Sequence, residues 1–360
     1  MKYRTLVFLV FFIALVAVPF HRYRTSILNA SPLIMTTLTS EKDRLHKVAD
    51  LMLEIYEELA KMRYIQPAGI QHGPHNITHL ESAYDELDLD PSVKYLYSIL
   101  PYIDTIAAGQ DSFTQIGEFA DFRDIEQAEQ GRDPFYGDPS EPNFEDEDGP
   151  YIKPWVTPLT SLGNHGSVLL YDTRRHVIWI IDQESWDTTD PALEGYPTKE
   201  PTSLNQNSFE HIPYRAAESV LRDILGWYRS LHWIPGGGEG TGLEWDIYTL
   251  PLEKLYRENG WPHSFDGDSF EVAQMRSYCV HRIMDDEDEN VEGEDLALLE
   301  LKCLQRELGY ARNEVDYLKT QIQTEDALED LEVLKKRLSV SEQRVSVYQR
   351  AVGAAEAEAT

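Results

Sequence analysis

Three acidic residues near the middle of the chain could perform acid–base chemistry as paired carboxylates. Asp172 follows the apolar run Ser167–Tyr171. Asp182 and Glu184 follow the second run, His176–Ile181. Two carboxylates about 5–9 Å apart across a pocket would suit glycoside hydrolysis. The same positions are also ordinary for turn and strand-end residues. A carboxylate-based, glycosidase-like hydrolase therefore stands as an alternative function, and no catalytic residue is assigned.

Three histidines, His72, His75 and His79, have a spacing that could bring imidazoles around a metal ion. No cysteine or carboxylate completes the set within residues 71–79, so a polar loop is the preferred interpretation. We predict no metal site and no cofactor. The same segment holds Asn76-Ile77-Thr78, an N-glycosylation sequon that matters only if the domain lies outside the cytosol.

Two further motifs are weak. The glycine-rich stretch Gly236–Gly242 has no Lys-Ser/Thr after its glycines and precedes no clear helix start, so it indicates a flexible loop, not a phosphate-binding loop. Ser161, His165 and Ser167 lie too close along the chain to indicate a catalytic triad, and no G-x-S-x-G motif occurs.

The two apolar runs predict a central β-hairpin. They are rich in β-branched residues and do not alternate with polar ones, so the hairpin should be covered on both faces. The turn Asp172–Arg175 joins them, and Gly163-Asn164-His165-Gly166 leads into the first strand with residues that tolerate positive φ. Because a rigid sheet displays such loops, we expect binding residues here. The candidates are Asn164, His165, Asp172, Trp179 and Trp227. The alternative is that they serve only the turn and the core.

Amphipathic patterns predict the helices that flank this hairpin. They are expected at Ser40–Tyr64, Ser92–Leu100, Tyr214–Leu231, Pro251–Gly260 and Val272–Met284. Two long polar excursions, Gly131–Pro150 and Ser185–Phe209, interrupt the pattern.

Length and charge limit the function. A chain of 360 residues can hold one domain of roughly 200–250 residues with accessory segments. The formal net charge of −31 argues against nucleic-acid binding, because phosphate contacts need a basic face. Two cysteines, Cys279 and Cys303, cannot make a disulfide framework.

Residues 1–24 have the layout of a targeting segment. Lys2 and Arg4 precede the apolar run Leu6–Phe20, whose length of about 15 residues is short for a membrane span. We expect an uncleaved anchor that places residues 6–20 in a membrane. A cleaved signal peptide, or a cytoplasmic protein whose translation starts at Met35, remains an alternative. Positive charge flanks both ends of the run, so the orientation is left open.

The C-terminal part predicts a coiled coil over residues 296–353, after an acidic linker at 285–295. Heptad spacing runs from Leu301 to Ile322 and again from Leu331 to Val352. The interval between the two blocks fits no unbroken heptad, so a break is expected near residues 324–329. We expect a parallel homodimer through residues 301–352, in which Cys303 of two copies could oxidise together. A helical hairpin within one chain is the alternative.

In the order of its elements, residues 41–284 resemble the fungal SUKH-like proteins, relatives of the Smi/Knr cell-wall-synthesis regulators. The resemblance rests on the helix ending in Tyr95–Pro101, on Trp155 followed by Leu162-Gly-Asn-His-Gly166, on the Asp-containing hairpin and on the helix Tyr214–Leu231. It implies an α+β domain with a twisted, mainly antiparallel sheet flanked by helices. It also implies a non-catalytic regulatory module that recognises protein partners, with a link to cell-wall or signalling regulation. The two long excursions and the N-terminal apolar run depart from that largely intracellular family.

Overall fold

The computed structural model describes residues 32–113, 115–135, 151–161, 166–182, 184–197, 199–200, 205, 207–236, 250–285, 295–325 and 327–358. The chain divides into two compact units, residues 1–47 and 48–360. The expected anchor at residues 1–24 lies outside the described residues. Within the described ranges, no helix is both long enough and apolar enough to cross a membrane.

The first long helix, α2, spans Pro32–Lys61 and begins earlier than the predicted start at Ser40. Proline suits the first turn of a helix, because the missing N–H has no partner there. In the second unit, α2 contributes a fully buried stripe. Its members between Leu51 and Leu59 are at most 1% exposed: Leu51, Met52, Ile55, Tyr56 and Leu59.

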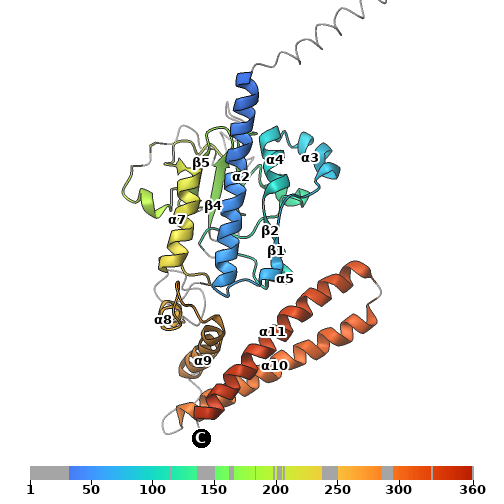
Figure 1. Ribbon diagram of the computed structural model, residues 1–360, viewed down its shortest axis with the longest axis vertical. Coiled ribbons are helices and arrows are strands. Elements are labelled where there is room, and N and C mark those ends of the chain that lie inside the picture. The colour runs from blue at the N-terminus through green and yellow to red at the C-terminus, as the bar shows by residue number, and fades with distance from the viewer. Residues whose placement is uncertain are drawn as a thin grey trace, which may run out of the picture. The chain divides into compact units, whose positions relative to one another are not determined.

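The predicted hairpin is the central pair of a four-stranded antiparallel sheet (Figure 1). The order is β3 (Val156–Pro158), β4 (Ser167–Asp172), β5 (Val177–Asp182) and β6 (Arg215–Ala216). All six residues of β4 are buried, so coverage of both faces is confirmed for this strand. A second antiparallel pair joins β1 (Ile70–Gln71) to β2 (Tyr102–Ile103). The fold is therefore α+β, as predicted.

Helix α7 (Ala217–Ser230) packs on β5 and β6. Its apolar face is buried, but the predicted start at Tyr214 is wrong, because Arg215 and Ala216 pair with β5 instead. The other short helices and helical turns are α3 (Glu81–Glu86), α4 (Pro91–Ile99), α5 (Thr105–Ala108), α6 (Ile125–Gln130), α8 (Leu252–Glu258), η1 (Pro67–Gly69), η2 (Thr78–Leu80) and η3 (Pro191–Leu193).

The C-terminal part consists of α9 (Gly267–Asp285), α10 (Leu296–Thr324) and α11 (Leu328–Glu358). The predicted break is confirmed, because α10 ends and α11 begins within residues 324–329. The two helices run antiparallel, because the partner on α11 moves toward its C-terminus as the position on α10 moves toward its N-terminus: Lys319–Glu342, Glu314–Arg344 and Gln305–Glu356. Leu304, Leu308 and Leu318 of the α10 heptads are thus buried within one chain, and Leu301 is partly buried. This is the helical hairpin that was the alternative expectation. The homodimer stays a prediction.

Cys303 forms a disulfide with Cys279 of α9, at a Cα–Cα distance of 5.8 Å. The expectation that Cys303 would oxidise with its counterpart in a second copy is therefore wrong for this structure. The acidic linker expected at 285–295 is described only at its two ends. Asp285 closes α9, and Asp295 caps α10 by accepting the Ala297 N–H.

Candidate functional site

The turn of the central hairpin is built around Asp172, a candidate binding residue. Its side chain is buried, at 2% exposure. Oδ1 accepts the backbone N–H groups of Arg174 and Arg175, each at 2.8 Å. The Asp172 carboxylate thus caps the N–H groups of its own turn, a common role of Asp. This capped turn fixes the backbone from which two neighbouring arginine side chains project.

Both arginines lie on aromatic rings. The Arg174 guanidinium carbon lies 3.8 Å from the centroid of Trp155. The Arg175 guanidinium carbon lies 4.3 Å from the centroid of Tyr214 and 5.5 Å from that of Trp179. Such contacts attract a cation to the ring face. We call Trp155, Arg174, Arg175, Trp179 and Tyr214 the arginine–aromatic surface.

The two arginines differ in their acidic partners. Arg174 donates a hydrogen bond of 2.7 Å to Asp90. Burial would raise the pKa of Asp90, but the hydrogen bonds from Ser92 and Arg174 outweigh it and hold that pKa below its ordinary value. Arg175 is exposed and has no carboxylate partner in the described part of the chain.

The other candidate binding residues lie elsewhere. Trp179 is 1% exposed and donates its Nε1–H to Ile212 O. It therefore packs beneath the Arg175 guanidinium and is not itself accessible to a ligand. Trp227 is half-buried near the end of α7, where it contacts Trp233. Asn164 and His165 lie outside the described residues. Of this surface, Trp155, Arg174, Arg175 and Tyr214 were not among the candidates from the sequence. The available signal was a pair of arginines at a hairpin turn in an acidic chain.

The candidate carboxylates do not face one another. In the register of the hairpin, Asp172 lies opposite Val177 and Asp182 lies opposite Ser167. Five residue steps of about 3.4 Å put the two acids roughly 17 Å apart, well beyond the spacing of paired glycosidase carboxylates. Asp182 Oδ1 accepts the N–H groups of Glu184 and Ser185, at 3.0 and 2.6 Å. Both aspartates cap turns.

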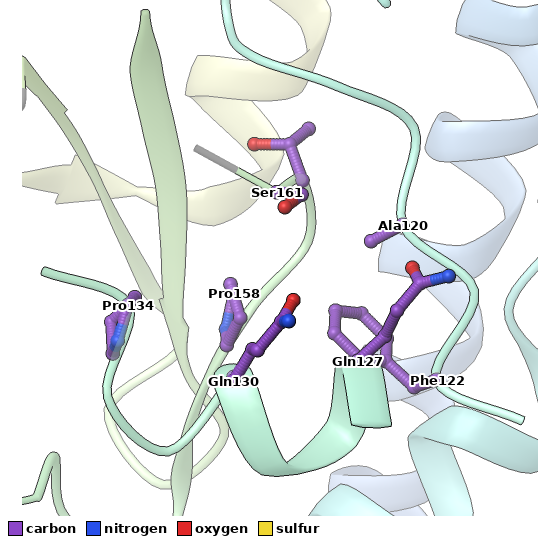
Figure 2. A pocket seen from close by; sticks show the side chains of 9 residues that line it. Ala120, Phe122, Gln127, Gln130, Pro134, Pro158 and Ser161 are labelled. Carbon is purple, nitrogen blue, oxygen red and sulfur yellow. The ribbon is translucent and has the colours of Figure 1, made fainter. Parts of the chain in front are cut away.

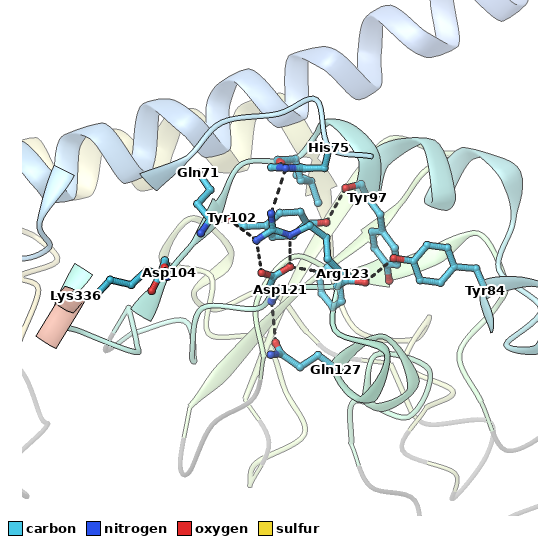
Figure 3. A network of polar contacts seen from close by, with 12 residues as sticks. Gln71, His75, Tyr84, Tyr97, Tyr102, Asp104, Asp121, Arg123, Gln127 and Lys336 are labelled. Atoms are coloured by element: carbon cyan, nitrogen blue, oxygen red, sulfur yellow. Dashed lines mark hydrogen bonds and ion pairs between the residues drawn. The ribbon is translucent and has the colours of Figure 1, made fainter. Parts of the chain in front are cut away.

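Of the three histidines, only His75 joins a polar network (Figure 3). His72 and His79 are exposed. His75 Nε2 lies 2.9 Å from Leu100 O, and Nδ1 lies 3.3 Å from Arg123 Nη1. This arrangement suits a neutral ring that donates from Nε2 and accepts at Nδ1. Burial lowers the pKa of His75, and the Arg123 charge acts in the same direction. Within the described ranges, no group of three or more His, Cys, Asp or Glu is placed to hold a metal.

Arg123 is the centre of this network. It donates to both oxygens of Asp121 and, at 2.6 Å, to Gln71 Oε1, and its guanidinium carbon lies 4.7 Å from the centroid of Tyr102. Gln127 Oε1 accepts the Asp121 N–H at 2.8 Å (Figure 3). These contacts join β1 and β2 to the segment before α6. Asp121, Gln71 and His75 together already engage the guanidinium, so we interpret the network as structural.

A small pocket is lined by Gln127 and Gln130 of α6 and by Pro158 of β3 (Figure 2). Its volume is about 20 Å³, which is room for about one water molecule. Two wider, open grooves have volumes of about 700 and 360 Å³. The lining of the larger contains one carboxylate, Glu57, and that of the smaller contains one, Glu271. None of these three spaces holds a facing pair of carboxylates.

Comparison of the chain with protein-family models, with curated proteins and with solved structures gives no match.

Proposed function

We propose that this protein is a non-catalytic interaction module, of the SUKH-like regulatory kind, that binds an acidic segment of a partner protein at the arginine–aromatic surface. The observation that carries the proposal is Arg175. Its guanidinium lies over Tyr214 and Trp179 without a carboxylate in the described part of the chain.

Arginine suits this task. Its planar guanidinium can stack on a ring while its N–H groups bind a carboxylate in the fork geometry that lysine lacks. Trp, Tyr and Arg are also the residues that most often dominate binding energy at protein interfaces. Because the aromatic rings already restrict Arg175, less side-chain entropy is lost when a ligand binds.

The large negative charge of the chain does not prevent binding of an acidic segment. At physiological ionic strength the Debye length is about 8 Å, so distant acidic residues are largely screened. The net charge close to Arg175 decides instead whether an acidic segment can bind. Asp90 is paired with Arg174, and Asp172 is buried under the turn. The exposed charge at the turn is therefore that of Arg175.

The test is fluorescence polarisation with a labelled glutamate-rich peptide. Arg175→Gln should weaken binding by about tenfold or more, the effect of a lost charge-assisted hydrogen bond. Arg337→Gln, at an exposed position of α11, is the matched control for net charge and should leave the affinity unchanged. Equal losses in the two variants, or no binding to the unaltered chain, would contradict the proposal.

Self-association through the exposed face of α10 is a second proposal. It differs from the parallel homodimer expected over residues 301–352, because the heptad positions of that dimer pack within one chain. Tyr310 and Tyr317 lie two helical turns apart on α10 and are 59% and 61% exposed. Exposed tyrosines are common at protein interfaces. Sedimentation velocity of the full chain should show a dimer that the double variant Tyr310→Glu/Tyr317→Glu dissociates. A monomer at all concentrations would refute it.

A further inference from the structure

The Cys279–Cys303 disulfide and the exposed sequon at Asn76 bear on where this protein matures. We propose that the protein matures in an oxidising compartment outside the cytosol, where this disulfide forms and Asn76 receives an N-linked glycan. This inference does not rest on the proposed binding function, and it departs from the largely intracellular SUKH-like proteins that the chain resembles.

The disulfide is built into the packing of the C-terminal helices. Cys279 is 0% exposed and Cys303 is 3% exposed. Both belong to an apolar cluster of α9, α10 and α11 that includes Ile283, Tyr348 and Ala351. The Cα–Cα distance of 5.8 Å lies at the centre of the range that a disulfide requires. These are the only two cysteines of the chain, so the bond has no internal thiol with which to exchange.

A buried bond of this kind indicates the compartment. Cytosolic thiols are kept reduced by glutathione and thioredoxin, whereas disulfides persist in the secretory pathway and outside the cell. Formation removes two protons and two electrons from Cys279 and Cys303. The acceptor is the disulfide of a thiol–disulfide oxidoreductase, which becomes a dithiol through a mixed-disulfide intermediate.

The Asn76 sequon has a geometry that suits modification. Asn76 is exposed, and its Oδ1 accepts the Thr78 N–H at 3.1 Å, so the triplet forms a turn on the surface. The preceding residue, His75, is fixed by its contacts with Leu100 and Arg123. Thr78 then begins the helical turn η2. Asn76 is thus displayed by an ordered backbone, and a glycan there would displace no core residue.

Transfer of the oligosaccharide to Asn76 balances in atoms and electrons. Asn76 Nδ2 attacks the anomeric carbon of an oligosaccharide carried on a lipid pyrophosphate. The C–N bond forms as the C–O bond to the pyrophosphate breaks, the lipid pyrophosphate leaves, and one amide proton passes to a base of the transferase. The transferase and its donor act outside the cytosol, the condition that the disulfide also requires. The targeting layout of residues 1–24 agrees with both features, whereas a cytoplasmic start at Met35 predicts neither.

The experiment uses the full chain expressed in a eukaryotic cell, with two readouts. Digestion with an N-glycan amidase should increase the mobility of the unaltered chain. Asn76→Gln and Thr78→Ala should each remove the shift due to this site, and Thr78→Ser, which keeps the sequon, should retain it. A second triplet, Asn29-Ala30-Ser31, is removed in every sample by Asn29→Gln. Labelling with a thiol-reactive polyethylene glycol under denaturing conditions should add nothing before reduction and two labels after it.

Each combination of results decides a part of the proposal. Glycosylation at Asn76 with blocked thiols supports it in full. An unglycosylated chain with two free thiols overturns the compartment. Blocked thiols without a glycan overturn the modification at Asn76, and a glycan with free thiols overturns the disulfide as a feature of the mature protein.

Discussion

Replacing Arg215 by glutamine should destabilise the fold far more than a surface charge change does. Arg215 donates to both oxygens of Asp190, at 2.7 and 2.9 Å, and to Asp223 at 2.6 Å. The Asp190 side chain is 1% exposed, so the substitution leaves a buried carboxylate without its cation. Breaking a buried pair in this way costs about 3–5 kcal/mol.

Arg222→Gln is the matched control. Arg222 pairs with Glu218 on α7, and both side chains are more than half exposed, at 52% and 55%. The loss of such a pair costs at most about 0.5 kcal/mol. The two variants should therefore differ by roughly 2.5–4.5 kcal/mol in free energy of unfolding, which is a urea midpoint difference of roughly 1–2 M for a slope of about 2 kcal/mol/M.

The double variant Arg215→Met/Asp190→Leu should recover much of the loss, because an apolar pair can replace a buried ion pair at little cost. Arg215 also holds the strand that follows Tyr214 against β5, so Arg215→Gln should weaken binding of the acidic peptide even where the protein stays folded. Equal midpoints for Arg215→Gln and Arg222→Gln would refute the reasoning, since the burial of Asp190 would then have no energetic consequence.

Three other changes have defined outcomes. Because the pKa of His75 is lowered in the folded state, the unfolded chain binds the proton first, and stability should fall as the pH drops below about 6.5; melting curves of His75→Gln should show a weaker pH dependence than those of the unaltered chain. Trp179→Ala, at a position 1% exposed, should cost about 3–5 kcal/mol in denaturant unfolding, and a loss below about 1 kcal/mol would contradict its core position. Leu318→Asp should reduce helical circular dichroism, whereas Tyr317→Asp should not, because Leu318 is 0% and Tyr317 61% exposed; equal effects would mean that α10 does not pack as described.

The sequence predicted the elements that repeat over many residues. The β-branched runs of β4 and β5 and the apolar stripe of α7 were all found where expected. The two flanking strands were not predicted, because β3 and β6 contain three and two residues. Segments that short carry no periodicity. Their pairing is decided by the strand beside them.

The site was harder to predict for the same kind of reason. Asp172 was selected correctly as a feature of the turn, since Asp caps turns locally. The role of Arg175 depends on Tyr214, which lies far along the chain and reaches it only through the pairing of β6 with β5. The disulfide could not be predicted for a similar reason. Heptad spacing placed Cys303 beside the α10 core, but nothing in that spacing identified α9 as the helix that brings Cys279 to it.

The arginines of this chain differ in whether they have an acidic partner. With 63 acidic residues against 32 basic ones, a guanidinium readily finds a carboxylate. Arg123 is paired with Asp121, and Arg276 with Glu300 and Glu358. Arg175 is exposed on two aromatic rings without an acidic partner in the described ranges. Because a bidentate carboxylate contact is stronger than a ring contact alone, Arg175 would gain from a carboxylate brought by another molecule.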